Sequence, residues 1–118
     1  MLAEVYMEKG DQQKACDYMN LTRTRAGLSA LSPSSMGSGA EGLMEEIRCE
    51  RARELFGEYQ RKFDLVRWGI WYERTVAYNE GTYIQDFIRP CHRFWPIPAE
   101  QVTYSGNQLD NNEYADLI

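Results

Sequence analysis

The sequence has few of the residues that most often carry chemistry. It contains a single histidine, His92, and three cysteines, Cys16, Cys49 and Cys91. The cysteines are far apart and odd in number, so they form neither a C-x-x-C pair nor a disulfide framework. A zinc site would have to combine His92 with scattered thiols, without the paired spacing that such sites use. We therefore expect no metal or cofactor, and we expect small buried thiols whose redox state is left open.

Long apolar runs and an excess of positive charge are also missing. No run approaches the roughly 20 residues that a membrane-spanning helix needs. The start, Met1-Leu2-Ala3-Glu4, has neither the basic nor the apolar region of an export signal. A formal net charge of −5 argues against nucleic acid as a ligand, because phosphate binding needs clustered positive charge. A chain of 118 residues can form one modest core, so we expect a single domain over residues 1–118.

Carboxylates are plentiful, but their spacing does not predict catalysis. An acidic ridge recurs every four residues at Glu46, Glu50, Glu54 and Glu58. A glycosidase needs two carboxyl groups that face each other across a cleft, which one ridge on one helix does not provide. Basic residues lie three or four positions away and predict an ion-pair network instead: Arg48, Arg51, Arg53, Arg61 and Lys62.

Two further patterns also favour structural roles. A Ser/His/Asp or Cys/His set must use His92, and its neighbour Cys91 is unfavourably placed because adjacent side chains rarely face each other in the needed geometry. The segment Gly37–Gly42 satisfies G-x-G-x-x-G, but a Pro/Ser-rich loop stands where a dinucleotide site needs a strand. We predict no catalytic residue.

Residues 1–28 are predicted to form a helical hairpin. The apolar residues of its first helix recur at i, i+3 and i+4, at Leu2, Val5 and Tyr6. Gly10 can end this helix in the left-handed conformation, and Asp11 can cap the next one. The second helix carries one stripe of small and apolar residues: Ala15, Tyr18, Met19, Thr22 and Ala26.

Residues 29–42 are predicted to be a flexible Ser/Gly/Pro loop, and residues 43–79 to be helical. The first of these helices runs from about Gly42 to Phe56, with apolar anchors at Leu43, Met44, Ile47, Leu55 and Phe56. The second runs from about Gln60 to Asn79, and its apolar residues surround it, which predicts burial on several sides.

The last of these segments, residues 80–118, is predicted to be extended or coil around its prolines, with one short helix at Ala99 to Tyr104. Trp68 is predicted to be a core residue. For Trp71, Tyr72 and Tyr78 three roles remain open: facing a ligand, facing a partner, or being buried. The predicted fold is all-α, with an irregular proline-containing C-terminal region.

The hairpin resembles one tetratricopeptide repeat. The repeat's small, aromatic, glycine and large apolar positions are matched by Ala3, Tyr6, Gly10, Ala15, Met19 and Thr22. A lone repeat cannot bury both faces of its hairpin, and no second copy follows. Either the hairpin docks on the rest of this chain, or its natural neighbours lie upstream, and we favour the second alternative. Without them the exposed apolar surface of residues 1–28 should drive self-association.

Three segments, in the same order, resemble the SusD/RagB family. Thr24-Arg25-Ala26-Gly27-Leu28 is similar to the R-x-R-A-G-L turn that follows the family's tetratricopeptide-like helices. Residues 50–69, from Glu50-Arg51 to Arg67-Trp68-Gly69, are similar to ER-x-x-EL…E-x-x-R-x-x-DL-x-RWG. The third segment looks like the closing PIP…N…QNPGY signature: Phe94-Trp95-Pro96-Ile97-Pro98, then Glu100, Asn107, Leu109, Asn111 and Tyr114.

The resemblance implies a surface lipoprotein of the outer membrane in Bacteroidetes. Such proteins capture glycans or other nutrients without chemical turnover and cap a SusC-like TonB-dependent transporter. They are several times longer than this chain, begin with a lipoprotein signal, and use N-terminal and mid-chain loops for most ligand contacts. This chain would be their C-terminal packing segment, and no ligand-binding residue is assigned to it.

The chain departs from the family pattern in two places. Tyr59 stands where the family usually has Gly, and Gly57 where it has a bulky residue. Asp110, Asn112 and Glu113 replace the usual Gln, Pro and Gly. The turn after the long helix and the tail should therefore differ in detail.

The resemblance to the family also implies structural roles for several charged residues. It implies that the long helix is linked to its neighbour through Glu50, Arg51, Glu54, Arg61, Asp64 and Arg67. Arg67→Ala should therefore lower the melting temperature and leave ligand affinity unchanged.

Two other functions remain as alternatives. The first is a free-standing tetratricopeptide-like scaffold that holds a protein partner. The second is a small glycan-cleaving enzyme, which would need two acids across a cleft. A lipoprotein signal and several hundred residues upstream in the gene would favour the nutrient-binding protein over the scaffold.

Overall fold

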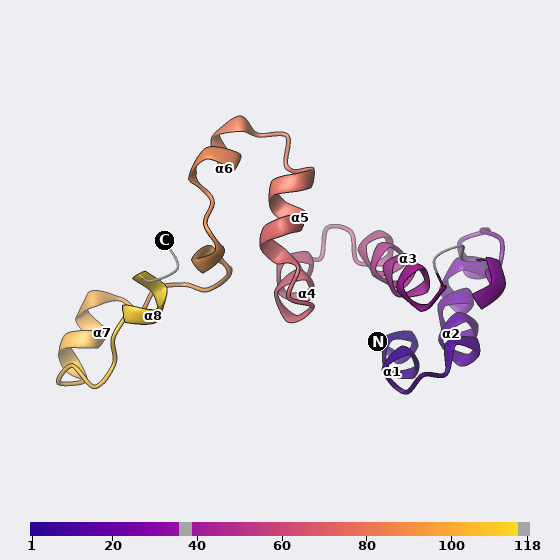
Figure 1. Cartoon of the computed structure of the whole chain (residues 1–118), viewed down its shortest axis with the longest axis horizontal. Helices are drawn as coiled ribbons and strands as arrows, with labels where there is room; N and C mark the ends of the chain where they lie inside the picture. Colours follow the sequence, from indigo (N-terminus) through magenta and orange to yellow (C-terminus); the bar gives the residue numbers. More distant parts are fainter. Residues whose placement is uncertain (36–38, 116–118) are drawn as a thin grey trace. The chain divides into compact units, whose positions relative to one another are not determined.

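The structure, a computed structural model, describes residues 1–35 and 39–115. Every regular element in these residues is helical, which confirms the predicted all-α class (Figure 1). No helix among them is long and apolar enough to cross a membrane. The chain divides into two compact units, residues 1–59 (unit 1) and 60–118 (unit 2). The single domain stays a prediction, because two compact units can still unfold together.

Unit 1 begins with the predicted hairpin, α1 (Leu2–Glu8) and α2 (Gln12–Arg25). Gly10 has a φ of 78°, and its N–H and that of Asp11 bond back to the last turn of α1 at 2.9 Å each. These are the hydrogen bonds of a Schellman motif, which needs a left-handed residue. The Asp11 carboxylate accepts the Lys14 N–H at 3.1 Å and caps α2. Both roles were predicted.

A third helix, α3 (Gly39–Glu54), packs against both helices of the hairpin. Ala15 is fully buried, and its small side chain allows the helices to approach closely. Leu43 is fully buried as well, and truncating such a residue costs about 2–5 kcal/mol. The core between the three helices consists of Ala3, Ala15, Cys16, Met19, Leu43 and Ile47.

The segment between α2 and α3 is shorter than the predicted loop. A 3₁₀ turn forms at Pro33–Ser35, and α3 already begins at Gly39. The end of the G-x-G-x-x-G pattern is therefore the first turn of a helix, and residues 37 and 38 lie outside the described residues.

The end of α3 also differs from the prediction. Phe56 was expected to be an apolar anchor, but α3 ends at Glu54 and the Phe56 side chain is 90% exposed. Gly57 follows with a φ of 82°, and Tyr59 also lies in the left-handed region, with a φ of 59°. A residue with a Cβ atom is strained in that region, so Tyr59 carries a cost that glycine would avoid.

Unit 2 opens with two helices, α4 (Arg61–Arg67) and α5 (Trp71–Tyr78). The prediction of one continuous helix to Asn79 was wrong, because Gly69 adopts a φ of 72° and ends α4. Its N–H and that of Ile70 bond back to α4 at 3.0 Å each, again as a Schellman motif.

The small core of unit 2 differs from the predicted one. Trp71, whose role was open, is 8% exposed and lies in this core with Leu65 and Cys91. Trp68, predicted to be a core residue, is only half-buried because it falls in the turn after α4.

The C-terminal region has more helical turns than predicted. The short helix α7 (Ala99–Tyr104) lies where it was expected. Three others were missed: α6 (Thr82–Phe87), a 3₁₀ turn (Pro90–Arg93) and α8 (Asn112–Ala115). Elements of four to six residues are too short to show a helical period in the sequence, which explains the error.

Candidate functional site

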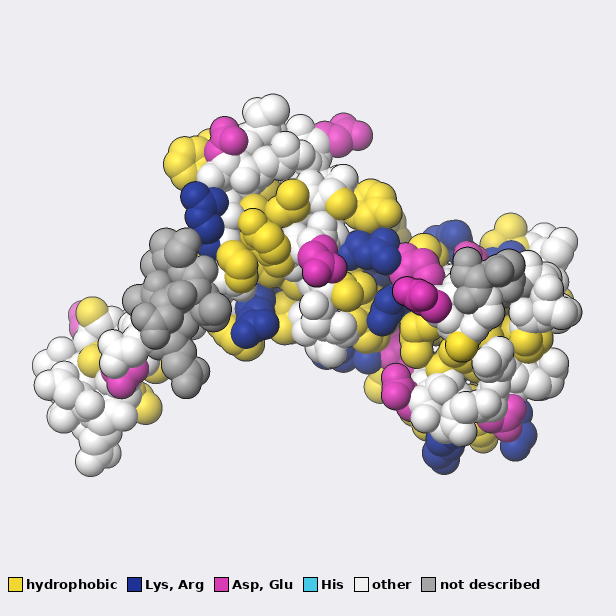
Figure 2. All heavy atoms as spheres, in the orientation of Figure 1, with side chains coloured by type: hydrophobic (Ala, Val, Ile, Leu, Met, Phe, Trp, Pro, Cys, Tyr) yellow, Lys and Arg dark blue, Asp and Glu magenta, His cyan; other side chains and the backbone are white. Residues whose placement is uncertain are grey.

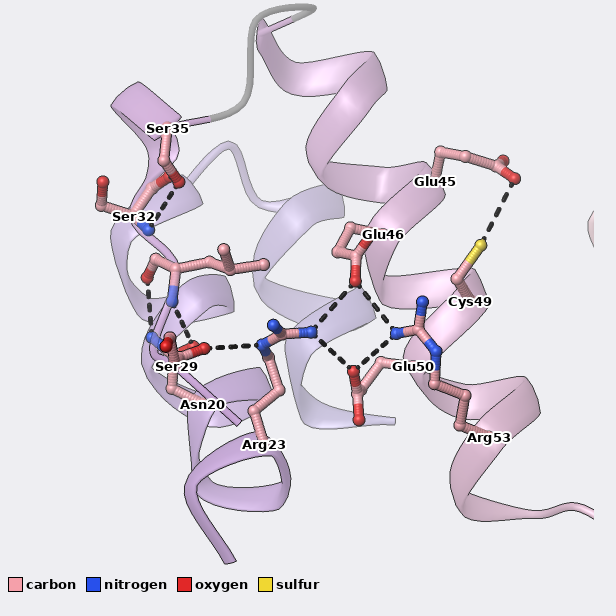
Figure 3. Close-up of polar contacts among 11 residues, drawn as sticks. Asn20, Arg23, Ser29, Ser32, Ser35, Glu45, Glu46, Cys49, Glu50 and Arg53 are labelled. Carbon is pink, nitrogen blue, oxygen red and sulfur yellow. Dashed lines mark hydrogen bonds and ion pairs between the residues drawn. The ribbon is translucent and has the colours of Figure 1, made fainter. Parts of the chain in front are cut away.

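The predicted acidic ridge of α3 is bonded to arginines from two helices. Arg23 of α2 places Nη1 3.1 Å from Glu46 Oε1 and 3.0 Å from Glu50 Oε2. Arg53 of α3 places Nη1 3.0 and 2.9 Å from the same two oxygens (Figure 3). The four side chains close a square of alternating charge, and hydrogen bonding to Glu46 raises the pKa of Arg53.

Two of the four side chains in this square are largely buried. The side chains of Arg23 and Glu50 are only 11% and 8% exposed, so water screens their attraction little. The two carboxylates lie on one side of one helix and share the same arginines. Both carboxylates are therefore bonded within the square, which links α2 to α3.

Further ion pairs connect the same helices. Arg25, at the end of α2, bonds to Glu54. Arg51 lies 3.9 Å from Glu4 in α1. The expected links from Glu50, Arg51 and Glu54 to neighbouring helices are thus present.

The partners on α2 were missed from the sequence. The prediction paired the ridge with bases nearby in sequence. The sequence signal that could have indicated these partners is an R-x-R segment, Arg23 to Arg25, together with acids spaced four residues apart at Glu46, Glu50 and Glu54.

Two asparagine side chains each form a pair of hydrogen bonds with the backbone of one distant residue. The Asn20 amide donates to the Leu31 C=O at 2.7 Å, and its oxygen accepts the Leu31 N–H at 2.8 Å. Asn111 donates to the Ile97 C=O at 2.9 Å and accepts the Ile97 N–H at 2.8 Å. Ile97 stands between two prolines, which have no N–H to donate. Asn111 therefore bonds the one N–H that Pro96-Ile97-Pro98 offers.

A pocket of about 380 Å³ opens between α1, α2 and α3. Its walls are mainly apolar, and Leu2 and Leu21 beside it are 54% and 66% exposed. Acidic and basic groups lie only at the α3 side. The lining residues are Met1, Leu2, Ala3, Tyr18, Met19, Leu21, Thr22, Glu50, Arg51, Glu54 and Leu55.

The residues considered for catalysis or metal binding, His92 and Cys91, have structural roles. His92 Nδ1 accepts the Arg89 N–H at 3.1 Å and caps a 3₁₀ turn. Cys91 is fully buried, and desolvation, with a contribution from Cys91, raises the pKa of Tyr114. Within the described residues, no group of three His, Cys, Asp or Glu side chains could hold a metal ion.

Like Cys91, the other two cysteines are not in disulfide bonds. Cys16 is fully buried, and this burial raises the pKa of its thiol. Cys49 is half-buried, with Sγ 3.8 Å from Glu45 Oε1.

Unit 2 places basic side chains over aromatic rings. Lys62 Nζ lies 5.6 Å from the centre of the Trp71 ring and 4.8 Å from that of Trp95. Trp68 is contacted by Arg61 at 5.7 Å and by Arg67 at 4.8 Å. These distances are typical of cation–π contacts. The sequence leaves a ligand-facing role open for Trp71, but no pattern in it connects the aromatic residues with these bases.

Comparisons with known proteins match nearly the whole chain. The sequence profile of the SusD family matches residues 1–115. The SusD-like protein P25 of Formosa agariphila is 35% identical over 114 residues. That match covers 95% of this chain but 21% of the relative, so the chain spans about a fifth of the relative's length. No solved structure matches the chain significantly.

Proposed function

Because the chain belongs to the SusD family, we propose that it is the C-terminal structural part of a nutrient-binding protein of the outer membrane. The full-length protein binds an oligosaccharide or another nutrient without catalysis, as members of the family do. The match over residues 1–115 carries this proposal.

The contacts of unit 1 support a packing role for this segment. The first family-like segment supplies Arg25, and the second supplies its partner Glu54. Arg23, directly before the first segment, bonds to Glu50 of the second. The first two of the three family-like segments are thus held together by ion pairs between α2 and α3.

The proposal includes a location and a partner. The full-length protein is a surface lipoprotein that associates with a SusC-like TonB-dependent transporter. Purifying the tagged full-length gene product from solubilised outer membranes should also recover such a transporter, identified by mass spectrometry. Recovery only from the soluble fraction, with no transporter and no retained oligosaccharide, would overturn the proposal. It would favour the scaffold alternative instead.

We also expect the 118-residue chain to self-associate through unit 1. The pocket between α1, α2 and α3 and the exposed Leu2 and Leu21 form an apolar surface on the predicted hairpin. Light scattering should show oligomers that Leu2→Ser and Leu21→Ser together reduce to monomers. Leu109→Ser, at a 47% exposed position of unit 2, is the control. A clean monomer at high concentration would contradict this expectation.

A further inference from the structure

Lys62 lies between two tryptophans that differ greatly in exposure. Trp71 is 8% exposed and belongs to the core of unit 2, whereas Trp95 is 84% exposed. The Lys62 ammonium lies within 6 Å of both ring centres, as a cation–π contact requires. The buried Trp71 ring thus contacts the cation from the protein side, and the ammonium lies over part of the exposed Trp95 indole. Figure 2 shows hydrophobic and basic side chains next to each other over the region of α4 and α5.

The fold holds each part of this arrangement in place. Lys62 is in the first turn of α4, and Trp71 begins α5, where the Thr75 hydroxyl donates to its carbonyl at 2.7 Å. Trp95 directly precedes Pro96-Ile97-Pro98, which the Asn111 side chain bonds at Ile97. The two prolines limit the backbone freedom of this segment. The indole is thus exposed and yet attached to a restrained backbone.

The contacts of the Lys62 ammonium favour an anionic ligand. An aromatic ring is neutral, so a cation over two rings keeps its full positive charge and its N–H donors can still reach a partner. The C–H face of a pyranose ring is apolar and can lie on an exposed indole, which offers a large apolar surface. The Lys62 ammonium lies over one part of that indole, so a sugar on the rest of the indole surface would bring a carboxylate or sulfate within its reach.

We propose that Lys62 and Trp95, supported by Trp71, form a binding subsite for an acidic saccharide. The sugar ring stacks on Trp95, and its anionic group pairs with Lys62. This inference rests on the proposed function and adds to it the charge of the ligand. It also assigns ligand contacts to a segment expected only to pack.

Affinity electrophoresis and calorimetry of the 118-residue chain and of the full-length protein test the subsite. The probes are polygalacturonate for the carboxylate, carrageenan for the sulfate, and neutral galactan. We expect binding to one or both acidic polymers. Lys62→Gln should weaken that binding about tenfold at low salt, because it removes one charge pair, and the effect should shrink as salt screens it. Trp95→Ala should weaken it about tenfold through lost stacking.

Matched variants control for surface changes. Lys9→Gln removes a cation that lies 5.9 Å from the Tyr6 ring in unit 1, and Tyr104→Ala removes an 80% exposed aromatic ring from α7. Both should leave affinity unchanged. Equal binding of neutral and acidic polymers, unaffected by Lys62→Gln, would overturn the subsite but leave nutrient binding intact. If the full-length protein binds the acidic polymer and neither Lys62→Gln nor Trp95→Ala lowers that affinity, the subsite would also be overturned and nutrient binding left intact. No polymer bound by either protein would count against both proposals.

Discussion

The two units use their basic side chains in different ways. In unit 1, Arg23, Arg25 and Arg53 are bonded to carboxylates that join α2 to α3. In unit 2, Lys62 and Arg93 lie over aromatic rings, of which Trp95 and Phe94 are 84% and 53% exposed. A carboxylate cancels the charge of its partner, but a ring does not. These three arginines of unit 1 therefore fix its own helices, whereas Lys62 and Arg93 of unit 2 keep charge that an external anion can meet.

The largest expected effect tests the buried ion pairs of unit 1. Arg23→Ala leaves Glu50, whose side chain is 8% exposed, with one cation fewer, and should lower the free energy of unfolding by about 3 kcal/mol. Arg25→Ala is the matched control, because that side chain is 68% exposed and should cost about 0–1 kcal/mol. Urea unfolding followed by circular dichroism measures both. Equal losses would show that burial does not distinguish the two pairs.

The same variant tests the predicted single domain. All three tryptophans, Trp68, Trp71 and Trp95, lie in unit 2, so their fluorescence reports that unit alone. If the chain unfolds as one domain, Arg23→Ala should shift the fluorescence and circular dichroism midpoints together. A shift seen only by circular dichroism would mean that the units unfold separately.

In unit 2 the next effect concerns the asparagine contact. Asn111→Ala removes two hydrogen bonds to Ile97 and should cost about 2 kcal/mol. Asn111→Asp keeps the acceptor but loses the donor, so it should fall between the alanine variant and the parent. Tryptophan fluorescence during urea unfolding provides the measurement. An aspartate variant less stable than the alanine variant would contradict the assigned bonds.

A smaller effect concerns a cation of unit 2. Arg67 bonds to Asp64 at 3.0 Å, and the Asp64 side chain is 6% exposed while that of Arg67 is 43% exposed. Arg67→Ala should lower the free energy of unfolding by about 1 kcal/mol, because it weakens the bonding of a buried carboxylate. Affinity for the acidic polymer should not change. An unchanged melting curve in differential scanning calorimetry would refute the predicted structural role.

The smallest effect is a gain in stability at the turn that follows α3. Tyr59 has a φ of 59° and a side chain that is 92% exposed, so glycine would remove strain without losing packing. Tyr59→Gly should stabilise the chain by about 0.5–1 kcal/mol. Gly57→Ala, at a φ of 82°, should have the opposite sign. Melting temperatures from calorimetry measure the stability of both variants. A Tyr59→Gly variant that is less stable than the parent would show that the backbone at Tyr59 is not strained.

The elements with a long period or a strong end signal were predictable from the sequence. The hairpin, its Gly10 end and its Asp11 cap follow from local chemistry, and so does the all-α class. The break at Gly69 was missed because the apolar residues continue on both sides of it. The contacts of Arg23 with Glu46 and Glu50 join residues 23 and 27 positions apart, which no local period reveals. Lys62 and Trp95 are likewise distant in the sequence, so their proximity needed the fold.

The bond between Asn111 and Ile97 has a further consequence for variation of this protein. It joins two residues that are 14 positions apart, with α7 between them, and it does so with one side chain and one backbone unit. The positions of both residues are then set independently of what lies between them. Longer or different segments inserted after Tyr104 should therefore be accommodated, because lengthening a closed loop adds little entropic cost. This part of the chain offers a natural place to graft an epitope or to diversify an exposed surface.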